Sequence, residues 1–86
     1  MKKDLFILGS TGSIGETTLK IVKKNRSTLR VKLLTTNKNV KKIYHQALKF
    51  NVKKIVIFDK NEYYKYAKKF ENKRINVFFS IKEVFK

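Results

Sequence analysis

The sequence predicts an α/β domain built on a parallel β-sheet, and three observations support this class. Short aliphatic segments typical of strands alternate with amphipathic segments typical of helices along all 86 residues. The aliphatic segments begin near residues 5, 29, 54 and 75, which leaves room for a helix after each of the first three. All three glycines lie in one stretch, Gly9–Gly15, directly after the first aliphatic segment. Alternation of this kind gives parallel strands joined by right-handed crossovers.

The first strand and the first helix flank the glycines. Leu5–Leu8 is a run of four apolar residues, which we expect to form a short buried strand. The side chains that recur at helical spacing after the glycines are Ile14, Thr18, Ile21 and Val22. We expect this stripe to be the apolar face of the first helix.

The remaining elements repeat the same order. The other expected strands are residues 29–36, which are rich in β-branched and aliphatic side chains, then the almost continuously apolar residues 54–58, and then residues 75–79. Helical periodicity follows two of these strands, and a single helical turn ends the chain. The candidate N-caps of these helices are Asn39, Asp59 or Asn61, and Ser80.

The predicted order is therefore β-α-β-α-β-α-β-α. This is the first half of a Rossmann-like, doubly wound parallel sheet, and we expect the strand order 3-2-1-4. No linker or internal repeat interrupts the alternation, so residues 1–86 are predicted to form one half-domain.

The composition excludes several classes of protein. The chain has no cysteine, so it holds no disulfide, thiol nucleophile or zinc cluster. No apolar run approaches the roughly 20 residues that span a bilayer. The first strand starts too early in the chain to leave room for a signal peptide. We therefore expect a cytoplasmic protein that has no membrane partner.

Charge is the strongest bias in the composition. There are 22 Lys and Arg against 6 Asp and Glu, a formal net charge of +16, which by itself suggests a nucleic-acid partner. However, 19 of the 22 cations are lysines spread over every segment, as the codons of an AT-rich genome would produce. We expect most of these lysines to be solvated and nucleic acid not to be the partner. A small basic nucleic-acid-binding module stays open as an alternative, and it would bind with a steep salt dependence.

The glycine stretch predicts a phosphate site. In this fold the turn after the first strand meets the pyrophosphate of a dinucleotide at the positive N-terminal end of the first helix. We expect Gly9 to allow the sharp exit from the strand and Gly15 to let the helix pack closely on the sheet. Gly12 would let backbone N–H groups approach the phosphate. The alternative is an ordinary turn that only caps a helix.

The end of the second strand indicates which dinucleotide fits. Domains that bind NAD place an Asp or Glu there, about 20 residues past the glycines, to bind the ribose 2′-hydroxyl. Here residues 35–39 read Thr-Thr-Asn-Lys-Asn and contain no acid. Lys38 would attract a 2′-phosphate, and Asn37 and Asn39 could donate hydrogen bonds to it. The sequence therefore favours NADPH, with an ordinary surface role for Lys38 as the alternative.

Together these motifs resemble the N-terminal segment of the 1-deoxy-D-xylulose 5-phosphate reductoisomerase family. The matching residues run from Leu5 to about Phe79 and include Leu8–Gly15, Asn25, Arg30–Val31, Asn37–Val40, Gln46 and Phe50. The resemblance implies a homodimeric enzyme that uses NADPH and a divalent metal, Mg or Mn. Its implied reaction rearranges and reduces 1-deoxy-D-xylulose 5-phosphate to 2-C-methyl-D-erythritol 4-phosphate in non-mevalonate isoprenoid biosynthesis.

The resemblance also implies a set of cofactor-binding residues. The pyrophosphate and nicotinamide-ribose end would be lined by Thr11, Gly12, Ser13 and Ile14, and the adenosine 2′-phosphate end would be held by Asn37, Lys38 and Asn39. At Asn37 the family usually has glycine, and asparagine tolerates a left-handed backbone better than most residues.

The family's metal ligands and substrate-binding residues fall beyond residue 86. We therefore expect residues 1–86 to be the NADPH-binding half-domain, without the catalytic and C-terminal domains and without turnover of its own. No catalytic residue or metal ligand is predicted in this chain. Another NADP-dependent reductase of Rossmann type remains the alternative within the same fold.

Overall fold

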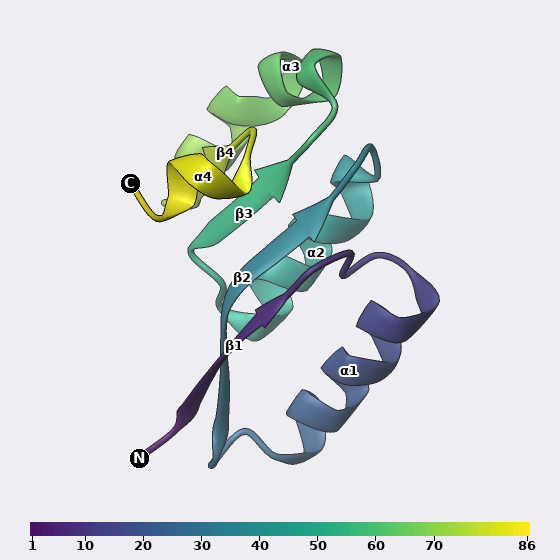
Figure 1. Cartoon of the computed structure of the whole chain (residues 1–86), viewed down its shortest axis with the longest axis vertical. Helices are drawn as coiled ribbons and strands as arrows, with labels where there is room; N and C mark the ends of the chain where they lie inside the picture. Colours follow the sequence, from purple (N-terminus) through teal and green to yellow (C-terminus); the bar gives the residue numbers. More distant parts are fainter.

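The computed structural model describes all 86 residues and contains one four-stranded parallel sheet and four helices (Figure 1). In chain order the elements are β1 (Lys3–Ile7), α1 (Ser13–Lys24), β2 (Leu29–Thr36), α2 (Val40–Phe50), β3 (Lys54–Ile57), α3 (Lys60–Glu71), β4 (Asn76–Phe78) and α4 (Ile81–Val84). The predicted alternation of strands and helices is confirmed. None of the helices is long and apolar enough to cross a membrane.

Three of the four helices begin at side-chain caps that the sequence predicted. The Asn39 Oδ1 atom accepts a hydrogen bond from the Lys42 N–H at 3.3 Å. Asp59, rather than Asn61, caps α3, with its Oδ1 atom 3.0 Å from the Glu62 nitrogen. Ser80 caps α4 in the same way. Since each cap satisfies an N–H group that the helix itself leaves unpaired, these three helices start at residues fixed by local chemistry.

The predicted strand order 3-2-1-4 is wrong, because the strands lie in the order β1-β2-β3-β4. The fourth strand pairs with the third, with Ile55 opposite Val77 and Val56 opposite Phe78. Both β1 and β4 are therefore edge strands, each with a neighbouring strand on one side only.

The link between α3 and β4 explains the difference. To place its fourth strand beside β1, the chain would have to travel from β3 across three strand spacings of about 4.8 Å each. Instead the chain turns back at once, since the Ile75 N–H donates to the Phe70 carbonyl at 3.1 Å. Arg74 takes a left-handed conformation in this turn, with φ of 59°. The Asn76 N–H then bonds the Lys53 carbonyl at 2.8 Å, which aligns β4 with the start of β3.

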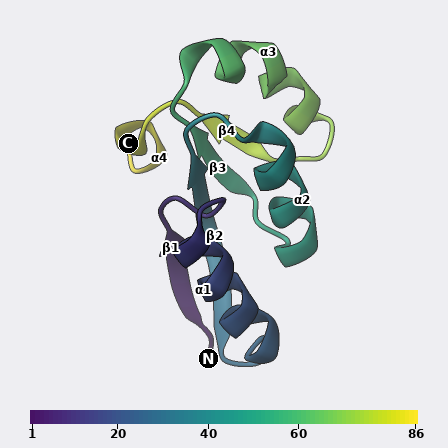
Figure 2. The ribbon, with the colours of Figure 1, turned by 90° about the vertical axis from the view of Figure 1, so that its right-hand side faces the viewer.

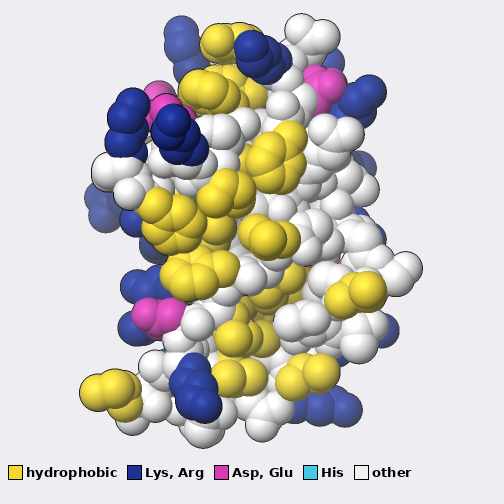
Figure 3. Space-filling model, in the orientation of Figure 1, with side chains coloured by type: hydrophobic (Ala, Val, Ile, Leu, Met, Phe, Trp, Pro, Cys, Tyr) yellow, Lys and Arg dark blue, Asp and Glu magenta, His cyan; other side chains and the backbone are white.

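The helices divide unequally between the two faces of the sheet. Figure 2 shows α1, α2 and α3 on one face and the short α4 on the other. Phe85, just after α4, contacts Phe6 of β1 edge-to-face, with ring centroids 5.6 Å apart. Parts of this second face stay open, and hydrophobic side chains are visible across it in Figure 3, although Leu33 and Val56 are buried there. The sheet therefore has one well-covered face and one partly covered apolar face.

The hydrophobic core lies between the sheet and its three helices. Its fully buried members include Leu34 of β2, Ile43 of α2, Ile55 and Ile57 of β3, and Phe70 of α3. In β3 the side chains of Ile55, Val56 and Ile57 are all buried, as predicted from an almost continuously apolar strand.

The first strand is less buried than its apolar sequence suggested. Ile7 packs into the core, but Phe6 is 53% exposed and Leu8 lies beyond the end of the strand with most of its surface exposed. Successive side chains of a strand point to opposite faces. Phe6 points to the face that only α4 covers, so a continuous apolar run did not mean burial on both faces.

The buried face of α1 also differs from the prediction. The helix packs through Gly15, Leu19 and Val22, whereas Ile14 is 85% exposed and Ile21 is also exposed. Of the predicted stripe only Val22 is buried, so the helical period was correct but most of the stripe lies off the packed face. Gly15 has no side chain to hold the helix away from the sheet, so the helix approaches through the face that carries it.

Replacement of Phe70 by alanine should lower the free energy of unfolding by about 3–5 kcal/mol, because it removes a large side chain from a closed part of the core. Phe70 is fully buried and packs edge-to-face on Tyr44 with centroids 5.0 Å apart. The matched control is Tyr64→Ala on the same helix, since Tyr64 is 74% exposed. Urea unfolding followed by circular dichroism measures both; equal losses would contradict the described packing of α3.

Candidate functional site

The glycine loop, residues 8–12, is attached to the end of β2. The Gly9 N–H donates to the Thr35 hydroxyl at 2.7 Å, and the Ser10 N–H donates to the Thr35 carbonyl at 2.9 Å. The hydroxyls of Thr11 and Thr36 lie 2.8 Å apart in a further hydrogen bond. Because β1 and β2 are parallel neighbours, the loop and the end of β2 meet at the same edge of the sheet.

Two of the three glycines are required by the chain's own geometry. Gly9 has φ of +70°, a left-handed conformation that side chains rarely adopt. At Gly15 an added Cβ would lie 2.5 Å from both the Gly9 carbonyl oxygen and the Ser10 Cα, which are backbone atoms that cannot easily move. Both predicted roles, the sharp exit from the strand and the close approach of α1, agree with these positions.

Gly12 is different, because nothing in the chain requires a glycine there. Its φ of −86° and ψ of 178° suit any residue, and an added Cβ would meet only the Gly9 carbonyl oxygen at an ordinary 3.6 Å. The residue is solvent-exposed and serves as the N-cap of α1. The absence of a side chain therefore leaves space on the outer surface of the loop.

The first turn of α1 has free hydrogen-bond donors. Unlike α2, α3 and α4, this helix has no side-chain cap. The N–H groups of Thr11, Ser13 and Ile14 have no backbone acceptor. Free N–H groups and the positive end of the helix dipole form a favourable place for an anion. Thr11, Gly12, Ser13 and Ile14, predicted from sequence as one set, thus share one exposed surface.

The other predicted set, Asn37, Lys38 and Asn39, follows β2 directly and lies beside the glycine loop. All three residues are exposed. Asn39 also caps α2, so its carbonyl oxygen is occupied while its NH₂ group is free to donate. Asn37 does not take the left-handed conformation that glycine would favour, since only Asn51 and Arg74 among non-glycine residues have positive φ.

Sequence reasoning missed one acid near this turn. Asp59, at the end of β3, places its Oδ2 atom 3.9 Å from the Lys38 Nζ atom. The Lys38 side chain is 70% exposed, so this ion pair is loose and contributes little to stability. Lys38 and Asp59 meet because β2 lies beside β3 in the sheet. They are 21 residues apart in the sequence, so no local pattern predicted this ion pair.

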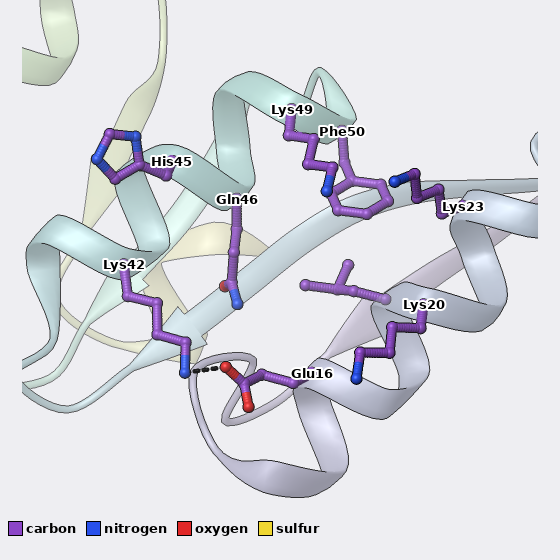
Figure 4. Close-up of a pocket in the computed structure, with 9 residues that line it drawn as sticks. Glu16, Lys20, Lys23, Lys42, His45, Gln46, Lys49 and Phe50 are labelled. Atoms are coloured by element: carbon purple, nitrogen blue, oxygen red, sulfur yellow. Dashed lines mark ion pairs between the residues drawn. The ribbon is translucent and has the colours of Figure 1, made fainter.

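Helix α2 supplies further contacts that the sequence did not reveal. The Gln46 Nε2 atom donates to the Ser10 carbonyl at 2.9 Å, and the Lys42 Nζ atom donates to the Thr11 carbonyl at 3.0 Å. Lys42 also forms an ion pair with Glu16 in the first turn of α1 (Figure 4). These side chains border a hollow of about 360 Å³ between α1 and α2, whose rim also carries Lys20, Lys23 and Lys49.

The pair with Lys42 changes the titration of Glu16. Its pKa is lowered from the ordinary glutamate value, first because the Lys42 ammonium group donates a hydrogen bond to the carboxylate and second because of the attraction between the charges. Elsewhere, no three His, Asp or Glu side chains gather closely enough to hold a metal ion. The residues present therefore do not fit the divalent metal that the resemblance implies.

A parallel sheet whose first strand leads through a glycine loop to an uncapped helix defines a dinucleotide-binding α/β domain. The sequence model of the family described as 1-deoxy-D-xylulose 5-phosphate reductoisomerase matches residues 5–85. The chain belongs to this family.

Individual relatives agree with this assignment. The chain is 42% identical over 76 residues to the 1-deoxy-D-xylulose 5-phosphate reductoisomerase of Pelagibacter ubique, a match that covers 88% of this chain and 20% of that protein. The Porphyromonas gingivalis enzyme is 44% identical over 64 residues, covering 74% of this chain and 17% of the relative. The chain thus spans about a fifth of the length of these relatives.

Solved structures of the family have the same fold. The Zymomonas mobilis 1-deoxy-D-xylulose 5-phosphate reductoisomerase in complex with NADPH superposes with a TM-score of 0.81 and 31% identity, over 90% of this chain and 20% of that one. A DOX-P reductoisomerase in complex with magnesium gives a TM-score of 0.78 at 29% identity, over 91% of this chain and 19% of that one.

Gly12 and Gly15, the second and third glycines of the stretch, should respond differently to alanine. Gly15→Ala should lower the free energy of unfolding by about 1–3 kcal/mol, because its Cβ would collide with the loop backbone. Gly12→Ala should change that free energy by less than about 1 kcal/mol, because the backbone angles and the space both accept a methyl group. Chemical unfolding of the two variants measures the difference. A Gly12→Ala loss as large as that of Gly15→Ala would contradict the described loop.

The pH dependence of the Glu16–Lys42 pair has a defined sign. Because the folded-state pKa of Glu16 is lowered, the stabilisation is present above the ordinary glutamate pKa and is lost as the pH falls through the lowered value. In Lys42→Met the pKa of Glu16 should rise toward its ordinary value. Titration of the Glu16 carboxyl signal by NMR measures this, with Lys41→Met as the control. An unchanged Glu16 titration in Lys42→Met would rule out the ion pair.

Proposed function

We propose that this chain binds NADPH, with the pyrophosphate on the glycine loop and the 2′-phosphate beside the end of β2. The observation that carries this proposal is the first turn of α1. Gly12 leaves open space that the chain itself does not need, and the N–H groups of Ser13 and Ile14 lack acceptors. A phosphate group would supply the acceptors and occupy the space. The NADPH complex of the related Zymomonas mobilis enzyme supports the choice of ligand.

The two predicted sets of residues suit the two ends of one extended ligand. Thr11, Gly12, Ser13 and Ile14 would line the pyrophosphate and nicotinamide-ribose end, and Asn37, Lys38 and Asn39 would hold the adenosine end. The hydrogen bond between Thr11 and Thr36 supports this arrangement, because it keeps the loop next to the turn that contains Lys38. All of these residues are exposed except Thr11, which is half-buried, so both sets are accessible.

Charge at the end of β2 supports NADPH over NADH. A carboxylate in this turn would bind the ribose 2′-hydroxyl of NADH and repel a 2′-phosphate. Residues 35–39 contain no acid, and Asp59, which lies nearest to Lys38, also caps α3. Lys38 can therefore leave its loose contact with Asp59 and neutralise a phosphate.

In this proposal, residues 1–86 are the N-terminal half of a larger NADPH-binding domain. The partly covered apolar face and the single-sided pairing of β1 are consistent with further sheet and helices in the complete enzyme. The complete enzyme would rearrange and reduce 1-deoxy-D-xylulose 5-phosphate, while this chain contributes cofactor binding and no catalytic group. The homodimer and the cytoplasmic location that the family suggests remain part of the same proposal.

Lys38 should determine the preference for NADPH. Lys38→Met should weaken NADPH binding by roughly five- to tenfold, the equivalent of about 1–1.4 kcal/mol for one exposed phosphate contact, and leave NADH binding unchanged. Gly12→Ala should weaken both nucleotides equally, since they share the pyrophosphate. Isothermal titration calorimetry of the 86-residue chain at fixed ionic strength provides the dissociation constants.

Lys41→Met is the matched control, because it removes the same charge from an exposed neighbouring position. Equal affinity of the unmodified chain for NADPH and NADH would contradict the role of Lys38. No binding of either nucleotide by the folded chain would contradict cofactor binding itself.

A further inference from the structure

The glycine loop is held from two sides, and the second side is helix α2. Figure 4 shows Lys42 and Gln46 extending from α2 across the groove toward α1 and the loop. They are four residues apart, so they lie on the same face of the helix. The Gln46 amide bonds the Ser10 carbonyl, and the Lys42 ammonium bonds the Thr11 carbonyl. Two consecutive carbonyls of the loop are thus fixed by side chains 31 and 36 residues away in sequence.

Fixing these carbonyls fixes the N–H groups that follow them. All peptide bonds in the chain are trans, so each carbonyl and the next N–H point in opposite directions. With the Ser10 and Thr11 carbonyls turned toward α2, the N–H groups of Thr11 and Gly12 point away from it. The Gly12 N–H bonds the Gly9 carbonyl, whereas the Thr11 N–H has no partner and faces outward.

The orientation of the Gln46 amide is determined by this contact. An exchange of its oxygen and nitrogen would bring its oxygen against the Ser10 carbonyl, two acceptors with no hydrogen between them. In the bonded orientation its Oε1 atom is buried and has no partner. A buried acceptor without a donor is unfavourable, so packing alone would prefer an apolar side chain of this length. The bond to the loop is what the glutamine amide contributes.

Lys42 has a second effect, on the charge beside the loop. Glu16 lies in the first turn of α1, where its carboxylate would oppose an anion held by the N–H groups of that turn. Lys42 pairs with this carboxylate and donates to Thr11 at the same time. One ammonium group thus neutralises the nearby acid and orients the loop.

We propose that Gln46 and Lys42 are positioning residues for the pyrophosphate of the cofactor: they hold the Ser10 and Thr11 carbonyls away from the ligand so that the free Thr11 N–H faces it. This inference rests on the proposed binding of NADPH. It differs from the role of Lys38, because the pyrophosphate is common to NADPH and NADH. Loss of a positioning residue should therefore weaken both nucleotides by the same factor.

The test uses Gln46→Met, which removes the donor to Ser10 and the unpartnered acceptor together and keeps the length of the side chain. We expect the variant to unfold at the same temperature as the parent chain or a higher one. NADPH and NADH should both bind roughly tenfold more weakly, the effect of one misaligned charge-assisted hydrogen bond. Backbone amide hydrogen exchange of Gly12, whose N–H is bonded to the Gly9 carbonyl within the loop, should become faster.

Lys42→Met is the second variant, and Lys42→Arg should rescue it because arginine can donate to both Thr11 and Glu16. Lys41→Met, on the same helix without a contact to the loop, is the control. The proposal would be overturned if the Gln46→Met variant bound both nucleotides as tightly as the parent chain. A loss confined to NADPH would also overturn it, because it would indicate a 2′-phosphate contact instead. If the parent chain binds neither nucleotide, the proposed function fails, and unchanged Gly12 hydrogen exchange in Gln46→Met then overturns the positioning role independently.

Discussion

The close approach of α1 to the glycine loop is the contact on which the rest of the site depends. At Gly15 the helix lies so near the backbone of Gly9 and Ser10 that a single methyl group would not fit. This contact selects which face of α1 packs, and it brings the free N–H groups of Ser13 and Ile14 to the edge of the sheet. The position of the proposed anion site therefore depends on the close distance between this helix and the loop.

The loop is then held by two different kinds of contact. On the side of β2, backbone and hydroxyl groups of Thr35 and Thr36 bond to it at short range. On the side of α2, Gln46 and Lys42 bond its carbonyls through longer side chains. Together they explain how a glycine-rich segment, which has high conformational freedom by itself, can present a defined surface to a ligand.

The corrected strand order places this surface at the edge strand β1. All three long helices cover one face of the sheet, and only α4 crosses to the other, where Phe85 meets Phe6. The lysines, in contrast, are spread over the surface, and those beside the groove are partly offset by Glu16.

The sequence by itself determined the order of elements, three helix caps, the place of the glycine loop and the lack of an acid after β2, because each depends on neighbouring residues. Only the tertiary structure decided the order of the strands, the buried face of α1, and the contacts of Lys42, Gln46 and Asp59. These join residues that are distant in sequence, and no local pattern encodes which of the 19 lysines will meet the loop, or that the single glutamine will. The strand order depends on the short turn at Arg74. The left-handed backbone of this residue is seen only in the structure, where β4 pairs with β3.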